Sequence, residues 1–259
     1  MKNIFKTSYL IILLLAGTYQ SNAAEKVELL KTDWSFKGLF GKFDRGSLQR
    51  GYQVYTEICS SCHSMKYVSY RNLFEPGGPE FSEDQAKAIA ANFEVNDGPN
   101  SDGEMFIRPA KLSDKFVMPF ANVKAAQAAN GGAYPPDMSV LAKARSGGVD
   151  YIYSVLLGYE NPPSGVTLDN GVYYNKFMYG NKIKMAKPLS NDLIEYSDGT
   201  VASEEQMAKD VTTFLMWAAE PHLEARHKMG FKAILYLIIL TILVYFSMKK
   251  IWSRIESEV

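Results

Sequence analysis

The sequence predicts a mainly α fold, in which a loop-rich domain is followed by one C-terminal transmembrane helix. Two observations support this prediction. Apolar residues recur at helical spacing only in short segments, which are separated by long stretches rich in Gly, Pro, Asn and Tyr. One uninterrupted apolar run, 234–244, contains no charge and no helix breaker and lies near the C-terminus.

The expected helices are few and mostly short. Apolar residues at helical spacing predict a helix over 47–58. Ser203 and Gln206 form a capping-box start for a late helix, which Pro221 interrupts. Between them the pattern favours helices at 82–94, 122–129, 139–144 and 148–157, and residues 25–46 are expected to form an irregular arm. Long ordered loops of this kind usually surround a ligand or carry function.

Charge is distributed unevenly along the chain, although 28 basic and 28 acidic residues balance overall. Seven basic residues and only two acidic ones lie outside 25–227, so this stretch holds 21 basic and 26 acidic residues and has a net charge of −5. An acidic domain argues against nucleic-acid binding and suits a basic protein partner. Ordinary solubility is the alternative explanation.

Residues 1–24 have the features of a secretory signal peptide. Lys2 and Lys6 precede an apolar core over 9–16, and cleavage is expected after Ala23 or Ala24. An uncleaved anchor is the alternative. A long Arg- and Ser-rich presequence is absent, which favours export to a bacterial periplasm.

The second apolar run has the length of a transmembrane helix, predicted over 228–250 and followed by a cytoplasmic tail, 251–259. Lys249, Lys250 and Arg254 place the C-terminus in the cytoplasm by the positive-inside rule, and the signal peptide places 25–227 on the other side. A buried core helix is the alternative. These features predict a single-pass protein of the bacterial inner membrane with a periplasmic domain.

Cys59-Ser60-Ser61-Cys62-His63 is Cys-x-x-Cys-His, the attachment signature of c-type haem. Two thiols at this spacing can form thioethers with the two vinyl groups on neighbouring pyrroles. The next residue then lies beneath the iron, so His63 can be an axial ligand. The sequence therefore predicts one covalently bound haem c in a domain of the class I cytochrome c type.

Three other sites could use the same cysteines. A thioredoxin-like dithiol would need a βαβ pattern, which does not surround the motif. A zinc site could add His222 and His227, which lie about 160 residues away beside the membrane helix. A disulfide between Cys59 and Cys62 would close a very small, strained loop.

Methionine commonly ligates haem iron opposite histidine in electron carriers. Position in the chain leaves five candidates in the soluble domain, with His222 and His227 as bis-histidine alternatives: Met105, Met118, Met138, Met178 and Met185. Met185 lies in an irregular segment shortly before the last soluble helix. That is where a simple class I cytochrome c places its methionine, so position favours Met185.

Beyond this motif the sequence resembles the cytochrome c1 family, the haem subunits of the ubiquinol–cytochrome c reductase (cytochrome bc1) complex. The resemblance extends from about Trp34 to Trp252. It rests on RGYQVY at 50–55, RPAKLSD at 108–114, NGGAYPPDMS at 130–139, ARSGGVDY at 144–151 and DVTTFLMWAAEP at 210–221. Together these stretches are far more specific than the haem motif alone.

The resemblance implies a role for several further residues. Met185 is implied as the sixth iron ligand, and Arg145 as the partner of a haem propionate. Asn130 and Tyr151 are expected near the same haem edge, and Pro135 and Pro136 against the ring. Glu94, Asp97, Asp102 and Glu104 form a short acidic region that either docks a soluble cytochrome c or is simply solvated.

The resemblance also implies the function. The chain is expected to take single electrons from a Rieske iron–sulfur protein and give them to a cytochrome c, beside cytochrome b in the membrane. The mitochondrial inner membrane, with the domain in the intermembrane space, is the alternative location. A haem subunit of a periplasmic dehydrogenase or reductase, with an open sixth position, and a ligand-binding haem sensor are the alternative functions.

Overall fold

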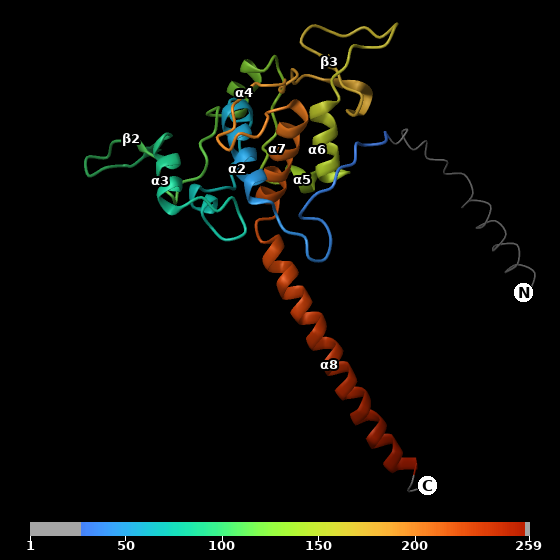
Figure 1. Ribbon diagram of the computed structural model, residues 1–259. Helices are drawn as coiled ribbons and strands as arrows, with labels where there is room; N and C mark the ends of the chain where they lie inside the picture. Colours follow the sequence, from blue (N-terminus) through green and yellow to red (C-terminus); the bar gives the residue numbers. More distant parts are fainter. Residues whose placement is uncertain (1–26, 257–259) are drawn as a thin grey trace, which may run out of the picture.

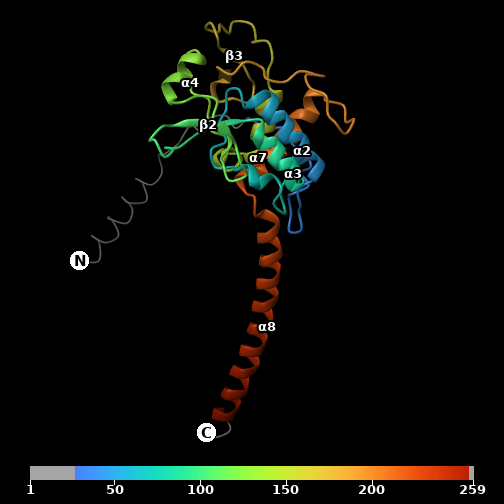
Figure 2. The same cartoon turned by 90° about the vertical axis from the view of Figure 1, so that its left-hand side faces the viewer.

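The computed structural model describes residues 27–256, so the predicted signal peptide, 1–24, lies outside the described residues. A compact domain of helices and loops stands on one long helix that projects away from it (Figures 1 and 2). The domain contains these helices: α2 (Arg45–Val54), α3 (Glu83–Ala91), α4 (Val123–Ala129), α5 (Leu141–Ala144), α6 (Gly148–Leu157) and α7 (Glu204–Ala219). Two short 3₁₀ turns add η2 (Tyr70–Leu73) and η3 (Tyr179–Asn181). The predicted mainly α fold is confirmed.

Helices α2 and α7 pack together at the centre of the domain (Figure 1). Their backbones are closest at Gly51, where a Cβ atom would collide with the backbone carbonyl of Asp210. The fully buried Asp210 carboxylate accepts hydrogen bonds from Ser47 Oγ and from the Arg50 guanidinium, whose Nε lies 2.8 Å away. Because a buried charge must be paired, this network fixes α2 on α7.

The predicted helix over 47–58 is two elements rather than one. Asp44 caps α2 by accepting a hydrogen bond from Ser47 N–H, 2.6 Å, so the helix begins before the predicted residue. After Val54 the chain widens into a π-helical turn, η1 (Tyr55–Cys59). Such turns are rare and often occur at functional sites. This one ends at the first cysteine of the motif.

The other helix ends follow local capping chemistry. The predicted 148–157 is confirmed, and the predicted 122–129 becomes α4 with Asn122 as its N-cap. Ser203 caps α7 by accepting from Gln206 N–H, but the Gln206 side chain turns to Asp210 instead of completing the capping box. The predictions 82–94 and 139–144 were too long, because α3 ends at Ala91 and α5 begins at Leu141.

Two small antiparallel hairpins were not predicted. One pairs β1 (Glu94–Asp97) with β2 (Phe106–Pro109), and the other pairs β3 (Tyr173–Tyr174) with β4 (Lys182–Ile183). The first hairpin contains the predicted acidic region, with Glu94 and Asp97 on β1 and Asp102 and Glu104 in the connection between the strands. Its strands are held by the Arg108 guanidinium, which pairs with Asp97 and Asp114.

The segment before α2 has no helix or strand over 27–44, as predicted for an irregular arm. It is nevertheless fixed to the core. Trp34, Phe36 and Phe43 are buried, and Trp34 Nε1 donates to Asp150 Oδ1 over 2.6 Å. The arm therefore lies across α6 and ends close to the start of the long helix.

The long helix, α8 (Leu223–Glu256), follows a break after α7 that contains Pro221, as predicted. Its 34 residues span about 50 Å at 1.5 Å per residue, more than the ~30 Å of a bilayer core. None of its most apolar 18-residue window is buried against described residues. The alternative of a buried core helix is therefore wrong, and a transmembrane helix fits.

Candidate functional site

The Cys-x-x-Cys-His motif forms one tight turn at the end of η1. Ser60 N–H donates to Tyr55 O over 2.8 Å, which is the last bond of the π-helical turn. The carbonyl of Cys59 then accepts from both Cys62 N–H, 3.1 Å, and His63 N–H, 2.9 Å. A carbonyl shared between these two amides brings both cysteines and the histidine into a single turn. The Cys-x-x-Cys-His spacing therefore gathers two thiols and one imidazole in a single compact turn.

The imidazole of His63 is held in one tautomer. Its Nδ1 lies 2.8 Å from the carbonyl oxygen of Pro136. Because a carbonyl can only accept, Nδ1 carries the proton and donates it. Burial, partly opposed by this hydrogen bond and by Asp137, lowers the pKa of His63, so the ring is neutral near pH 7. The lone pair of Nε2 is then free for a metal, as in most histidine metal ligands.

The segments on either side of this hydrogen bond are tied together by Asp137. Its carboxylate accepts from Ser64 Oγ, 2.8 Å, from Lys66 N–H, 3.0 Å, and from Ser139 N–H, 3.0 Å. Met138 N–H also donates to Ser64 O over 2.8 Å. Burial alone would raise the pKa of Asp137, but these hydrogen bonds outweigh it and lower the pKa. The charged carboxylate therefore fixes Pro136 against His63.

Asp137 was not predicted as a site residue from the sequence. The signal that could have found it is its place directly after Pro135-Pro136, in a stretch that carries the family resemblance. An Asp in such a turn commonly accepts hydrogen bonds from backbone N–H groups nearby in the chain. Here it accepts from a segment about 70 residues away as well, which only the fold reveals.

Cys59 does not have the environment of a reactive redox thiol. Burial, with a smaller contribution from Cys62, raises the pKa of the Cys59 thiol to about 12. Reactive dithiols need a thiol pKa that is lowered instead.

No three His, Cys, Asp or Glu residues within 27–256 could hold a metal ion together. His227 lies instead at the base of α8, with Nδ1 3.3 Å from Gly41 O, so the zinc alternative has no support in the fold.

Met185 follows β4 and is half-buried against the hydrophobic core. Its carbonyl accepts a hydrogen bond from the Tyr159 hydroxyl over 3.0 Å, which fixes the backbone of this irregular segment. Two of the other methionines have different roles. Met138 is buried in the segment tied to Ser64, on the His63 side, and Met178 Sδ accepts from the Tyr151 hydroxyl over 3.1 Å.

The remaining two methionines, Met105 and Met118, expose 65% and 51% of their surface. A ligand that closes a haem site is expected to be better covered than this. Met185 is half-buried and lies 122 residues after His63 in the sequence, so it stays the predicted sixth ligand.

The residues expected around the haem edge are placed separately by the structure. Arg145 is exposed, donates only to its neighbour's carbonyl, Ala144 O, over 3.3 Å, and forms no ion pair with any described residue. Asn130 caps the end of α4, with Nδ2 2.7 Å from Ala126 O. Pro135 and Pro136 lead into the turn at Asp137, and the carbonyl of Pro136 is hydrogen-bonded to His63.

Part of the predicted acidic region is already paired. The carboxylate of Asp97 binds Arg108 within the β1–β2 hairpin, and this hydrogen bond is the main reason that the pKa of Asp97 is lowered. Glu94, Asp102 and Glu104 form no ion pair with described residues. Three of the four acidic side chains in this region therefore remain without an ion pair among the described residues.

Comparisons with known proteins place the chain in a family. The model of the Cytochrome C1 family matches residues 34–255. "Cytochrome b/c1" of Bradyrhizobium diazoefficiens is 50% identical over 85% of this chain, which spans only 35% of that protein. "Cytochrome c1 1, heme protein, mitochondrial" of Arabidopsis thaliana is 47% identical over 87% of this chain and 72% of its own length. "Cytochrome c1" of Rhodospirillum rubrum is 46% identical over 95% of both chains. With a match that covers nearly the whole described chain, this protein belongs to the cytochrome C1 family.

Proposed function

We propose that this chain carries one c-type haem, bound by thioethers to Cys59 and Cys62, with His63 Nε2 and Met185 Sδ as iron ligands. Family membership makes it a haem electron-transfer subunit of the cytochrome bc1 complex. Within that complex we propose that it takes single electrons from the Rieske iron–sulfur protein and passes them to a cytochrome c.

The observation that carries this proposal is the hydrogen bond from His63 Nδ1 to Pro136 O. This hydrogen bond leaves the lone pair of Nε2 available to bind a metal. Two thiols lie on the same turn. A haem bound there supplies a one-electron iron couple, whose potential depends on the axial ligands and on burial. The chain itself would ligate the iron, orient the haem and cover it from solvent. No side chain needs to act as an acid, a base or a nucleophile.

The expected partners of the haem propionates and ring follow from the same geometry. Arg145 has an exposed guanidinium without a carboxylate partner among the described residues, so it is available to a propionate as a bidentate donor. Pro136 already contacts His63, which favours a place for Pro135-Pro136 beside the ring. Asn130 and Tyr151 use their side chains within the fold, so their proposed place near the haem edge depends on the family resemblance.

We further propose that α8 anchors the protein in the membrane with the haem domain outside the cytoplasm. The division into signal peptide 1–24, haem domain 25–227, membrane segment 228–250 and tail 251–259 is part of this proposal. Structural support comes from the exposed apolar surface of α8 and from Lys249, Lys250 and Arg254 near its far end. A bacterial inner membrane with a periplasmic domain is the proposed location.

Two measurements test the function. Purification in mild detergent should recover the chain with a cytochrome b and a Rieske protein, and recovery without them would contradict the complex. The reduced protein should bind carbon monoxide slowly or not at all, because Met185 closes the sixth position. Rapid binding would favour an enzyme or a sensor with an open iron site.

A further inference from the structure

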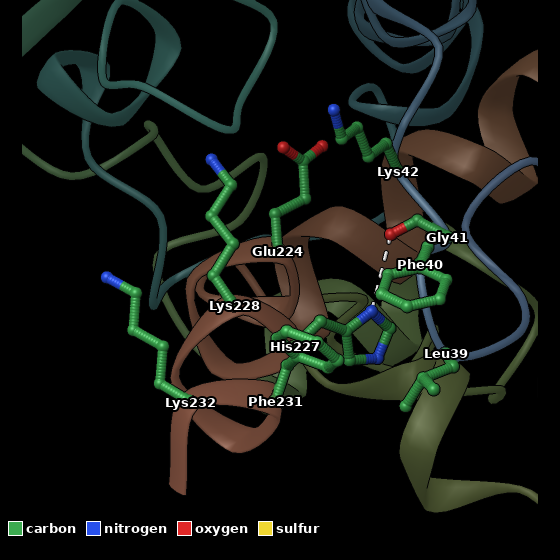
Figure 3. Close-up of a pocket in the computed structure, with 9 residues that line it drawn as sticks. All are labelled: Leu39, Phe40, Gly41, Lys42, Glu224, His227, Lys228, Phe231 and Lys232. Atoms are coloured by element: carbon green, nitrogen blue, oxygen red, sulfur yellow. Dashed lines mark hydrogen bonds between the residues drawn. The ribbon is translucent and has the colours of Figure 1, made fainter. Parts of the chain in front are cut away.

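A groove of about 220 Å³ lies where α8 leaves the haem domain. One wall is the loop 39–42 and the other is the first turns of α8 (Figure 3). The groove lining does not include Cys59, Cys62 or His63, and the proposed electron transfer does not use it. Its lining combines large apolar side chains with lysines.

The loop that forms one wall is fixed rather than free. Its ends are closed by hydrogen bonds from Lys37 N–H to Trp34 O and from Lys42 N–H to Ser35 O, both 3.0 Å. Gly41 allows this tight path, because a Cβ atom there would collide with the backbone of Phe36. The contact between His227 Nδ1 and Gly41 O then holds the loop to α8.

This fixed loop presents apolar side chains outward. Leu39 is 59% exposed and Phe40 is 71% exposed. The ring of Phe40 meets the ring of Phe231 on α8, with centroids 5.8 Å apart, and Phe231 is itself 48% exposed. Phe231 lies three residues before the apolar run 234–244 of α8, so these three side chains lie where the helix is proposed to enter the bilayer. An exposed apolar patch at that level fits lipid chains.

Positive charge surrounds the same groove. Lys42, Lys228 and Lys232 form no ion pair with any described residue. Lys228 and Lys232 are one helical turn apart and extend from the same side of α8 in Figure 3. The one carboxylate in the lining, Glu224, is already bound by Arg45 through Nη1 and Nη2 at 2.8 and 3.0 Å.

We propose that this groove binds an anionic phospholipid from the membrane leaflet that faces the haem domain. The three lysines would contact the lipid phosphate, and an acyl chain would lie over Leu39, Phe40 and Phe231. Free phosphate would leave the apolar wall uncovered. A membrane phospholipid matches the net positive charge, the apolar wall and the position beside the bilayer together.

The test uses the full haem-loaded chain in phosphatidylcholine vesicles with spin-labelled lipids. Wild-type protein should associate with phosphatidylglycerol in preference to phosphatidylcholine. The double variant Lys228→Gln, Lys232→Gln should lower the relative association of phosphatidylglycerol roughly thirtyfold. Phe40→Ala should weaken it severalfold through the lost apolar contact.

The matched control is Lys124→Gln with Lys182→Gln, which removes the same charge from exposed lysines on α4 and β4. It should keep the preference, and every variant should keep the haem absorption spectrum. Equal association of both lipids with wild type, or a preserved preference in the Lys228 and Lys232 variant, would overturn the proposal. The proposal would also be overturned if the Lys228 and Lys232 variant lost a co-purifying subunit but kept its lipid preference, because a protein would then cover the groove.

Discussion

Replacing Asp137 by Ala should destabilise the protein strongly, although Asp137 is partly exposed. The carboxylate accepts three hydrogen bonds, from Ser64 Oγ, Lys66 N–H and Ser139 N–H, at 2.8 to 3.0 Å. At about 1 kcal/mol for each bond, the free energy of unfolding should fall by about 3 kcal/mol. Urea titration of the full chain in detergent, followed by circular dichroism, measures this change.

A conservative variant separates the hydrogen bonds from the shape of the side chain. Asp137→Asn keeps one acceptor oxygen, so it should lose roughly half as much, about 1–2 kcal/mol. Asp169→Ala is the matched control, because Asp169 is exposed and its carboxylate has no hydrogen bond or ion pair among the described residues. If Asp137→Ala and Asp169→Ala unfold within about 0.5 kcal/mol of each other, Asp137 does not hold the His63 turn.

Three further predictions follow from other parts of the fold. Met185→Leu should lower the reduction potential and allow rapid carbon monoxide binding, and an unchanged absorption spectrum would place the ligand elsewhere. Gly51→Ala should destabilise the domain by about 2–3 kcal/mol, because the added Cβ would collide with the Asp210 backbone. Gly230→Ala is the control and should have no such effect, because the space around Gly230 is open. Thermal unfolding compares the two variants. A backbone N–H and a neighbouring guanidinium lower the pKa of Asp198 from 3.8 to about 2, so its stabilisation is present above pH 4 and is lost as the pH falls toward 2. Asp198→Asn should therefore flatten the stability profile between pH 4 and 2, and an unaltered profile would exclude this contribution.

The parts of the fold that the sequence predicted correctly depend on local chemistry. Asn122 and Ser203 are recognisable N-caps, and the apolar run of α8 needs no tertiary information. The hairpin of β1 and β2 was missed, because it depends on Arg108 pairing with Asp97 across the turn. A four-residue strand with little buried surface has almost no periodic signal.

The candidate site shows the same division. The motif of Cys59, Cys62 and His63 is contiguous, so its chemistry could be read directly from the spacing. Pro136 lies 73 residues from His63 and was expected near the haem only through the family resemblance. The tautomer of His63 and the long-range hydrogen bonds of Asp137 could not be predicted, because both join segments that are distant in sequence.

Intact-mass spectrometry of the denatured protein measures the thioether bonds directly. After unfolding and extraction with acidified acetone, the chain should retain its colour, and its mass should exceed that of the processed polypeptide by one haem. Cys59→Ala together with Cys62→Ala should abolish this excess. Extraction of the pigment into acetone, leaving the mass of the bare polypeptide, would contradict covalent attachment and with it the proposed function.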